Sequence, residues 1–232
     1  MNLPQTVLSE TDKQPGTRAL WLRIAFWISI GISVAVVLRR LIALATPNRN
    51  GPPQMVQVDH DFASHTSLTL AHIVPALLFV LLAPFIVFKR TRRNISLERT
   101  FYILGAIVGL TAYAMSSFSV GGWIERSAVL VFDSFYLFSL GRAYLYRQGL
   151  DSALEHRWQL RALAILLGIA TTRPVMGVFF ATARVTHLVP SQFFGIAFWV
   201  GFSLNVLAFE LWIRAVDRRE ARFAELRATR AH

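Results

Sequence analysis

The 232-residue chain has no cysteine, and charged residues make up only 16% of it. Without cysteine there is no disulfide framework, no thiolate metal site and no cysteine nucleophile. The sequence also lacks a P-loop, a GxSxG elbow, a Rossmann fingerprint and the protein-kinase motifs, which argues against an ATP-driven or soluble-type enzyme. Enzymatic activity stays open on this evidence, and a non-enzymatic role is favoured.

Acidic residues are scarce as well, since 13 Asp and Glu stand against 24 Lys and Arg for a formal net charge of +11. Such an excess is typical either of nucleic-acid binding or of the flanks of membrane spans. Because 54% of the residues are hydrophobic, the composition favours a membrane protein whose partner is the lipid bilayer and not a nucleic acid.

Long apolar stretches dominate the sequence, and a spanning helix requires about 20 such residues. Helices of a soluble protein would carry a polar face, but stretches such as IVPALLFVLLAPFIVF have none. We therefore predict an all-α, polytopic transmembrane helix bundle. Its six spans are expected at about 20–38, 68–88, 101–118, 127–146, 160–183 and 192–216.

The two ends of the chain differ from the spans. Residues 1–18 carry prolines and scattered charges and no apolar run that would mark a signal peptide, so we expect a disordered tail. Residues 217–232 alternate acids with bases and place Phe223 and Leu226 on one helical face. This pattern favours a basic amphipathic helix at anionic headgroups over an RNA-binding arm.

Positive charge sorts by side of the membrane. The KRTRR run, Arg147, Arg157 and the arginine-rich tail all flank the same side of six spans. Since cytoplasmic flanks collect Lys and Arg, we predict that both termini are cytoplasmic, with anionic lipids at that face. The expected location is a bacterial cytoplasmic (inner) membrane.

Four polar residues lie inside predicted spans at similar depths from the outer surface: His72, Tyr113, Asp133 and Arg173. A charge in the hydrocarbon core costs at least about 2.5 to 3.5 kcal/mol, so each requires a partner or a function. One interpretation is an outward-facing binding cavity or proton path. The other is a structural ion pair between Asp133 and Arg173 that locks two helices.

Histidines near the outer surface suggest a metal or haem. The segment VDHDFASH, predicted to be a polar outer loop, supplies His60 and His65, and His187 follows span five. Imidazole and carboxylate suit Zn, Cu, Ni or Fe, but the spacing lacks HExxH and a solvated loop is the simpler interpretation. A bis-histidine haem b requires imidazoles at matching depth, which leaves His72 with His187 or His65.

A second polar cluster is expected on the cytoplasmic side. The run EHRWQLR brings His156, Arg157 and Arg161 to the start of span five, and span six carries Asn205 and Glu210. We expect Glu210 to contact Arg161 or Arg157. The interface position favours a structural over a catalytic role for this contact.

Several stretches resemble a known family: AHIVPALLFVLLAPF, NISLER, HRWQLRALA and NVLAFELWIR. From about Leu68 to Arg214 the chain is similar to a bacterial membrane-protein family catalogued as domain of unknown function 2306. The resemblance marks His72, His156, Arg157, Arg161 and Asn205 as family-like positions. Glu98 and Arg99 stand where the family has a His–Arg pair, which argues against a histidine-ligated cofactor. The family supplies no established activity.

Two functions follow from these features. The first is a membrane protein that binds or moves a small hydrophobic or ionic ligand through the layer of His72, Tyr113, Asp133 and Arg173. The second is a membrane redox protein that holds haem b or contacts quinone. No internal repeat relates the first three spans to the last three, which lowers the expectation of alternating-access transport.

Overall fold

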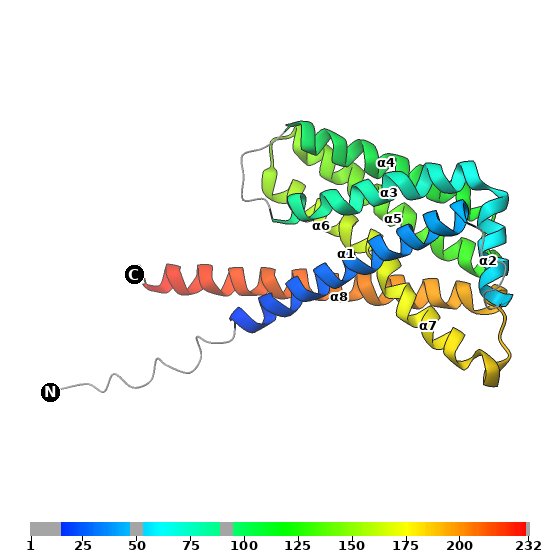
Figure 1. Ribbon diagram of the computed structural model, residues 1–232. Helices are drawn as coiled ribbons and strands as arrows, with labels where there is room; N and C mark the ends of the chain where they lie inside the picture. The colour runs from blue at the N-terminus through cyan, green and yellow to red at the C-terminus, as the bar shows by residue number, and fades with distance from the viewer. Residues whose placement is uncertain (1–14, 47–52, 89–94, 231–232) are drawn as a thin grey trace.

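The computed structural model describes residues 15–46, 53–88 and 95–230, and these fold into α-helices without a strand. Figure 1 shows the helices in order. They are α1 (Pro15–Ala45), α2 (Pro53–Ser64), α3 (Thr66–Val87), α4 (Ile95–Ser116), α5 (Gly122–Gln148), α6 (Ser152–Leu166), α7 (Gly168–Thr186) and α8 (Pro190–Arg230).

Six segments are long and apolar enough to cross a membrane, which confirms the predicted all-α architecture and number of spans. They are longer than predicted, because polar residues extend the helices past the apolar runs. The third begins at Ile95 and the first continues to Ala45. The six are Leu20–Ala45, Thr66–Val87, Ile95–Ser116, Gly122–Gln148, Ser152–Ala183 and Pro190–Arg219.

The outward faces of these helices are apolar. Large side chains such as Trp27, Phe85, Ile103, Phe135 and Leu204 are more than half exposed. Soluble monomers rarely expose contiguous apolar patches beyond a few hundred Å². Exposed apolar residues on each spanning segment are therefore the surface of an integral membrane protein that faces lipid acyl chains.

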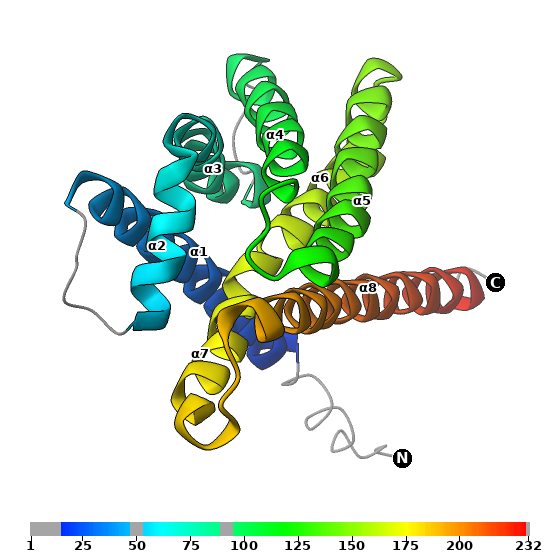
Figure 2. The ribbon, with the colours of Figure 1, turned by 90° about the vertical axis from the view of Figure 1, so that its right-hand side faces the viewer.

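The segment VDHDFASH is not a loop. It belongs to α2, a 12-residue helix that lies across the ends of α1 and α3 (Figure 2). Val58 of α2 is buried against a cluster that includes Met176 and Phe193, and the Thr69 hydroxyl donates to the Phe62 carbonyl at 3.0 Å. Because most residues of α2 are polar, the apolar face that packs on the bundle was not recognised in the sequence.

The fifth span consists of two helices. α6 ends at Leu166 and α7 begins at Gly168, where the prediction was one continuous span. A Cβ atom at Gly168 would lie 2.5 Å from the Phe202 ring, so the glycine at the start of α7 allows a close approach to α8. Broken helices at membrane depth are a recurring feature of ligand and ion sites in transporters.

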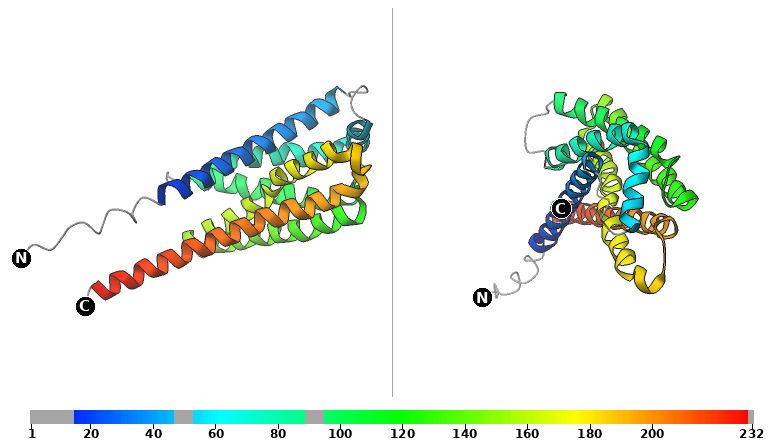
Figure 3. Two further views of the ribbon diagram at one scale, coloured as in Figure 1. Left: turned by 90° about the horizontal axis from the view of Figure 1, so that it is seen from below. Right: turned by 45° about the vertical axis from the view of Figure 1, so that its right-hand side comes forward.

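The described chain begins and ends at the same end of the bundle, which we call the terminal end (Figures 1 and 3). α2 covers the opposite end, which we call the α2 end. α5 packs most extensively on α6, and α7 on α8. The predicted turn between the third and fourth spans is present at the α2 end, where Gly122 adopts a positive φ of 59°.

The two tails differ in outcome. Residues 1–14 of the expected N-terminal tail and the basic run at 89–93 lie outside the described residues, and residues 15–18 belong to α1. Residues 217–230 are helical, as expected, but they continue span six as part of one 41-residue helix. This part of α8 projects past the other helices along the bundle (Figure 3) and does not turn aside as a separate segment.

Candidate functional site

A cavity of about 440 Å³ lies inside the half of the bundle nearer α2. Its walls come from α1 and from α3 to α8, and Met55 and Phe62 of α2 also line it. Apolar side chains such as Val80, Phe132 and Phe198 form much of the wall. Small-molecule sites typically have volumes of about 300 to 1,000 Å³ and mostly apolar walls with few polar groups, and this cavity has both properties.

Three of the four residues in the predicted polar layer line this one cavity: His72 from α3, Asp133 from α5 and Arg173 from α7. The Nδ1 atom of His72 lies 2.9 Å from the hydroxyl of Thr111 on α4. Tyr113 does not line the cavity, and its hydroxyl pairs with that of Ser134 at 2.5 Å. Three residues of the predicted polar layer therefore share one cavity, and the side chain of the fourth points elsewhere.

The predicted ion pair between Asp133 and Arg173 is wrong. Among the described residues no ion pair within 4.0 Å involves either side chain. Arg173 instead places Nη1 3.5 Å from the sulfur of Met176, while its Nε atom and Asp133 Oδ2 are buried without a hydrogen-bond partner. Matching depths on two helices did not imply contact, because the side chains lie at different positions around the cavity wall.

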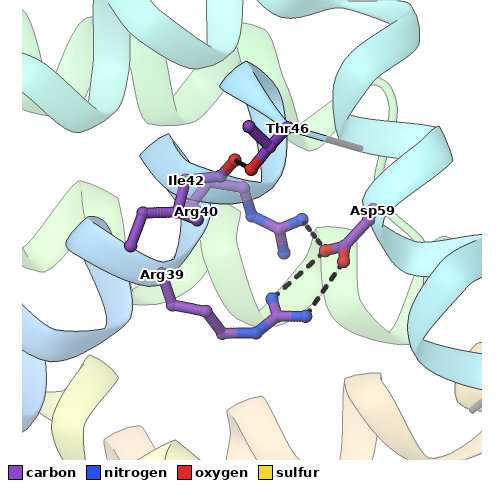
Figure 4. Close-up of polar contacts among 5 residues, drawn as sticks. All are labelled: Arg39, Arg40, Ile42, Thr46 and Asp59. Carbon is purple, nitrogen blue, oxygen red and sulfur yellow. Dashed lines mark hydrogen bonds and ion pairs between the residues drawn. The ribbon is translucent and has the colours of Figure 1, made fainter. Parts of the chain in front are cut away.

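Two further arginines reach the cavity from the end of α1 (Figure 4). Arg39 and Arg40 line it, and both bind Asp59 of α2. Nη1 and Nη2 of Arg39 donate to the carboxylate at 3.1 and 2.9 Å, and Nη1 of Arg40 donates at 2.6 Å. The guanidinium of Arg40 also lies 3.9 Å from the centroid of the Phe62 ring. The first span was predicted to end at about residue 38, whereas α1 continues to Ala45 and includes both arginines.

Glu125 adds a carboxylate to the same cavity. The residue is 7% exposed, and its Oε2 accepts from the backbone N–H of Gly121 at 2.6 Å. Glu125, Arg39, Arg40 and Arg173 all line this cavity, so one site holds four charged side chains. Glu125 lies two residues before the predicted start of the fourth span, so it was not among the polar residues expected inside a span, whereas α5 begins at Gly122.

The outer histidines do not form a ligand set. His60 is exposed, His65 packs its ring on Phe118 with 3.8 Å between centroids, and His187 caps α7 with a positive φ of 53°. In the described part of the chain no group of three or more His, Cys, Asp or Glu side chains is placed to hold a metal. Neither His65 nor His187 lines the cavity with His72, so the geometry does not favour the predicted metal and haem sites.

The polar cluster that was predicted for the cytoplasmic side joins α6 to α8. Arg161 binds Glu210 through two contacts of 2.7 and 3.3 Å, which confirms the predicted contact. Arg157 pairs with Asp217, and the Asn205 amide donates to the carbonyl of Ala164 near the end of α6. The remaining member, His156, is partly buried on α6. These contacts hold two helices together, and none of these residues lines the cavity described above.

A buried polar network near the terminal end was not predicted. The Tyr102 hydroxyl donates to Glu155 at 3.0 Å, and the Gln159 amide donates to Tyr102 and Glu155 at 3.0 and 3.1 Å. Beside it, Arg147 pairs with Glu98 at 3.2 Å. The network links α4, α5 and α6. Its members lie up to 57 residues apart, a separation that periodicity along one helix does not reveal.

The fold and cavity together define a class, a multi-pass helical membrane protein with an internal cavity that carries arginine and carboxylate side chains. No family model, curated protein or solved structure matches the chain. The resemblance to the domain of unknown function 2306 therefore stays a prediction, and the function has to be inferred from the cavity.

Proposed function

We propose that this protein binds a small amphipathic ligand within the outer half of the membrane and that it acts as a binding or transfer protein and not as an enzyme. The cavity carries this proposal. Its apolar wall suits the body of such a ligand, and the polar atoms of Asp133 and Arg173 that lack partners suit its polar groups. Buried polar groups without partners cost free energy, and a ligand that satisfies them recovers it.

The orientation is part of the proposal. We place the terminal end in the cytoplasm, with the α2 end outside, in a bacterial inner membrane. The positive-inside rule supports this orientation, because Arg147, Arg157 and Arg161 and the projecting part of α8 lie toward the terminal end. Anionic headgroups of the cytoplasmic leaflet would then interact with these arginines.

The broken fifth span also supports binding. Ile165 and Leu166 before the break line the cavity, and so do Ile169 and Arg173 after it. A break allows each half to move while the backbone groups around it stay inside protein. The fifth span, which consists of α6 and α7, therefore borders the cavity at its break.

The proposal is tested by filling the cavity. Ala112 and Ala114 are two residues apart on α4. Ala112 lines the cavity, whereas Ala114 is exposed on the surface of the bundle. We expect Ala112→Phe to abolish binding of 12-carbon amphiphiles, while Ala114→Phe leaves it unchanged. A ligand at about 100 times its Kd stabilises a protein by about 2.7 kcal/mol, so thermal unfolding in nanodiscs of zwitterionic two-chain lipid reports binding.

Equal stabilisation of both variants by the probes would contradict a cavity site. The redox alternative has its own test, the absorbance spectrum of the purified protein. A reducible Soret band would support bound haem b and would displace the proposal above. Quinone contact, which leaves the protein without such a band, would be measured by the same unfolding assay with a short-chain quinone as the probe.

A further inference from the structure

Arginine side chains outnumber their available partners at the α2 end of the cavity. Arg39, Arg40 and Arg173 line it together. Asp59 binds the first two, but Arg173 has no carboxylate within 4.0 Å among the described residues. An unpaired charge in a spanning segment is costly. A bound anion would supply the missing partner.

The nearest fixed carboxylates do not fill this role. Glu125 acts on Arg173 electrostatically but uses Oε2 to accept from the Gly121 backbone. Asp133 is eight residues further along α5 than Glu125, about 12 Å at a rise of 1.5 Å per residue, and no ion pair among the described residues joins it to Arg173. The guanidinium of Arg173 and the carboxylate of Asp133 are thus separate polar positions in the wall of one cavity.

α2 contributes to the wall of the same cavity. Met55 and Phe62 of α2 line the cavity, and Asp59 on the same helix binds Arg39 and Arg40. The Arg40 and Asp59 side chains are only 12% and 16% exposed, so their pairing is partly shielded from water. An anionic group that enters beside Arg173 meets Arg40 as well, where it competes with Asp59.

We infer that the ligand is a single-chain amphiphile with an anionic headgroup, a carboxylate or a phosphate monoester, which binds between Arg173 and Arg40. The inference rests on the proposed function and names its ligand class. Guanidinium is the side-chain group best matched to both headgroups, since its fork of donors pairs with two oxygens at once. A volume of about 440 Å³ is near the lower end for ligand sites and favours one acyl chain over two.

The test compares four probes that share a 12-carbon chain and differ in headgroup: dodecanoate, dodecyl phosphate, dodecanol and dodecyltrimethylammonium. Binding to the full chain is measured in nanodiscs of zwitterionic lipid. Charge-assisted hydrogen bonds contribute enough that we expect the two anions to bind roughly tenfold or more tightly than dodecanol. Acetate and inorganic phosphate without a chain should bind far more weakly, and native mass spectrometry of freshly purified protein would show whether a host lipid of this class is retained.

Variants assign the headgroup position. Arg173→Gln should remove the preference for anions, and Arg173→Lys should keep part of it because the charge remains without the fork. Arg126→Gln is the matched control, since Arg126 lies over Trp123 on the same side and does not line the cavity. Asp59→Asn should act in the opposite direction and tighten dodecanoate binding severalfold, because it removes the competing carboxylate.

The outcomes separate the two proposals. If none of the four probes binds, the proposed function fails and this inference fails with it. If the probes bind but dodecanol equals dodecanoate, or dodecyltrimethylammonium binds most tightly, the cavity is a ligand site and the anionic headgroup is wrong. Chain-free anions that bind as tightly as dodecanoate would also overturn the inference. Should Arg173→Gln fail to fold, Arg173→Lys and Asp59→Asn still decide it.

Discussion

The pair of Arg147 and Glu98 shows how burial decides the importance of a charge. Their side chains are 13% and 4% exposed, and the Arg147 guanidinium lies 5.7 Å from the centroid of the Tyr102 ring. By contrast, the Arg157 and Asp217 side chains are 36% and 45% exposed. Loss of Arg147 removes a charge-assisted contact from a carboxylate that is almost fully buried, whereas exposed pairs contribute little.

We therefore expect Arg147→Met to destabilise the protein by about 1.5 to 3 kcal/mol. Arg157→Met should cost at most about 1 kcal/mol. Reversible unfolding in mixed micelles measures both. The double variant Arg147→Met with Glu98→Gln should recover part of the loss, because the remaining carboxyl group is neutral. A double variant less stable than Arg147→Met alone would show that the two residues are not energetic partners.

At the scale of elements, the sequence predicted the spans better than the contacts between them. Hydrophobicity identifies a span because every residue in the stretch contributes, so the number of spans agrees with the structure. The direction of a single side chain depends on the exact start and rotation of its helix. This is why His72, Asp133 and Arg173 line one cavity as the polar layer implied, while Tyr113 does not.

Two local features were also missed, because each depends on a contact with a residue that is distant in the sequence. α2 is short and polar, so it was interpreted as a loop. For this reason the binding of Asp59 to Arg39 and Arg40 was not predicted. The close packing at Gly168 involves the Phe202 ring of another helix. Neither partner is visible from the residues that surround the feature in sequence.

The crossing of α7 and α8 depends on Gly201. A Cβ atom there would lie 2.7 Å from the backbone of Thr172, whereas at Gly141 on α5 it would meet nothing within 4 Å. We expect Gly201→Ala to destabilise the protein by about 1 to 3 kcal/mol through overpacking. Gly141→Ala should be neutral or stabilising by up to about 1 kcal/mol. Thermal unfolding of the two variants tests this, and equal effects would contradict a close helix contact.

At the scale of the whole molecule, the absence of cysteine makes the orientation directly measurable. Val189 between α7 and α8 is 47% exposed, and Leu150 between α5 and α6 is 78% exposed. Because the chain has no other cysteine, single substitutions at these positions carry one reactive thiol each. They lie at the α2 end and the terminal end, respectively.

We expect a membrane-impermeant maleimide to label Val189→Cys in intact spheroplasts, because the proposed orientation places this position outside. Leu150→Cys should be labelled after lysis and not before. The control is labelling of both variants in detergent, which shows that each thiol is accessible. The reverse pattern would place the termini outside and would contradict the orientation.

The continuity of α8 has a mechanical consequence. Phe198 and Phe202 of this helix line the cavity, and the same helix continues without a break to Arg230. From Phe202 to Arg230 is about 42 Å at 1.5 Å per residue. A rigid rod of that length amplifies small rotations at its base, so a tilt of about 10° near the cavity would displace the far tip by roughly 7 Å. Ligand binding in the cavity, if it tilts α8, would therefore be measurable as a displacement of the C-terminal end of this helix.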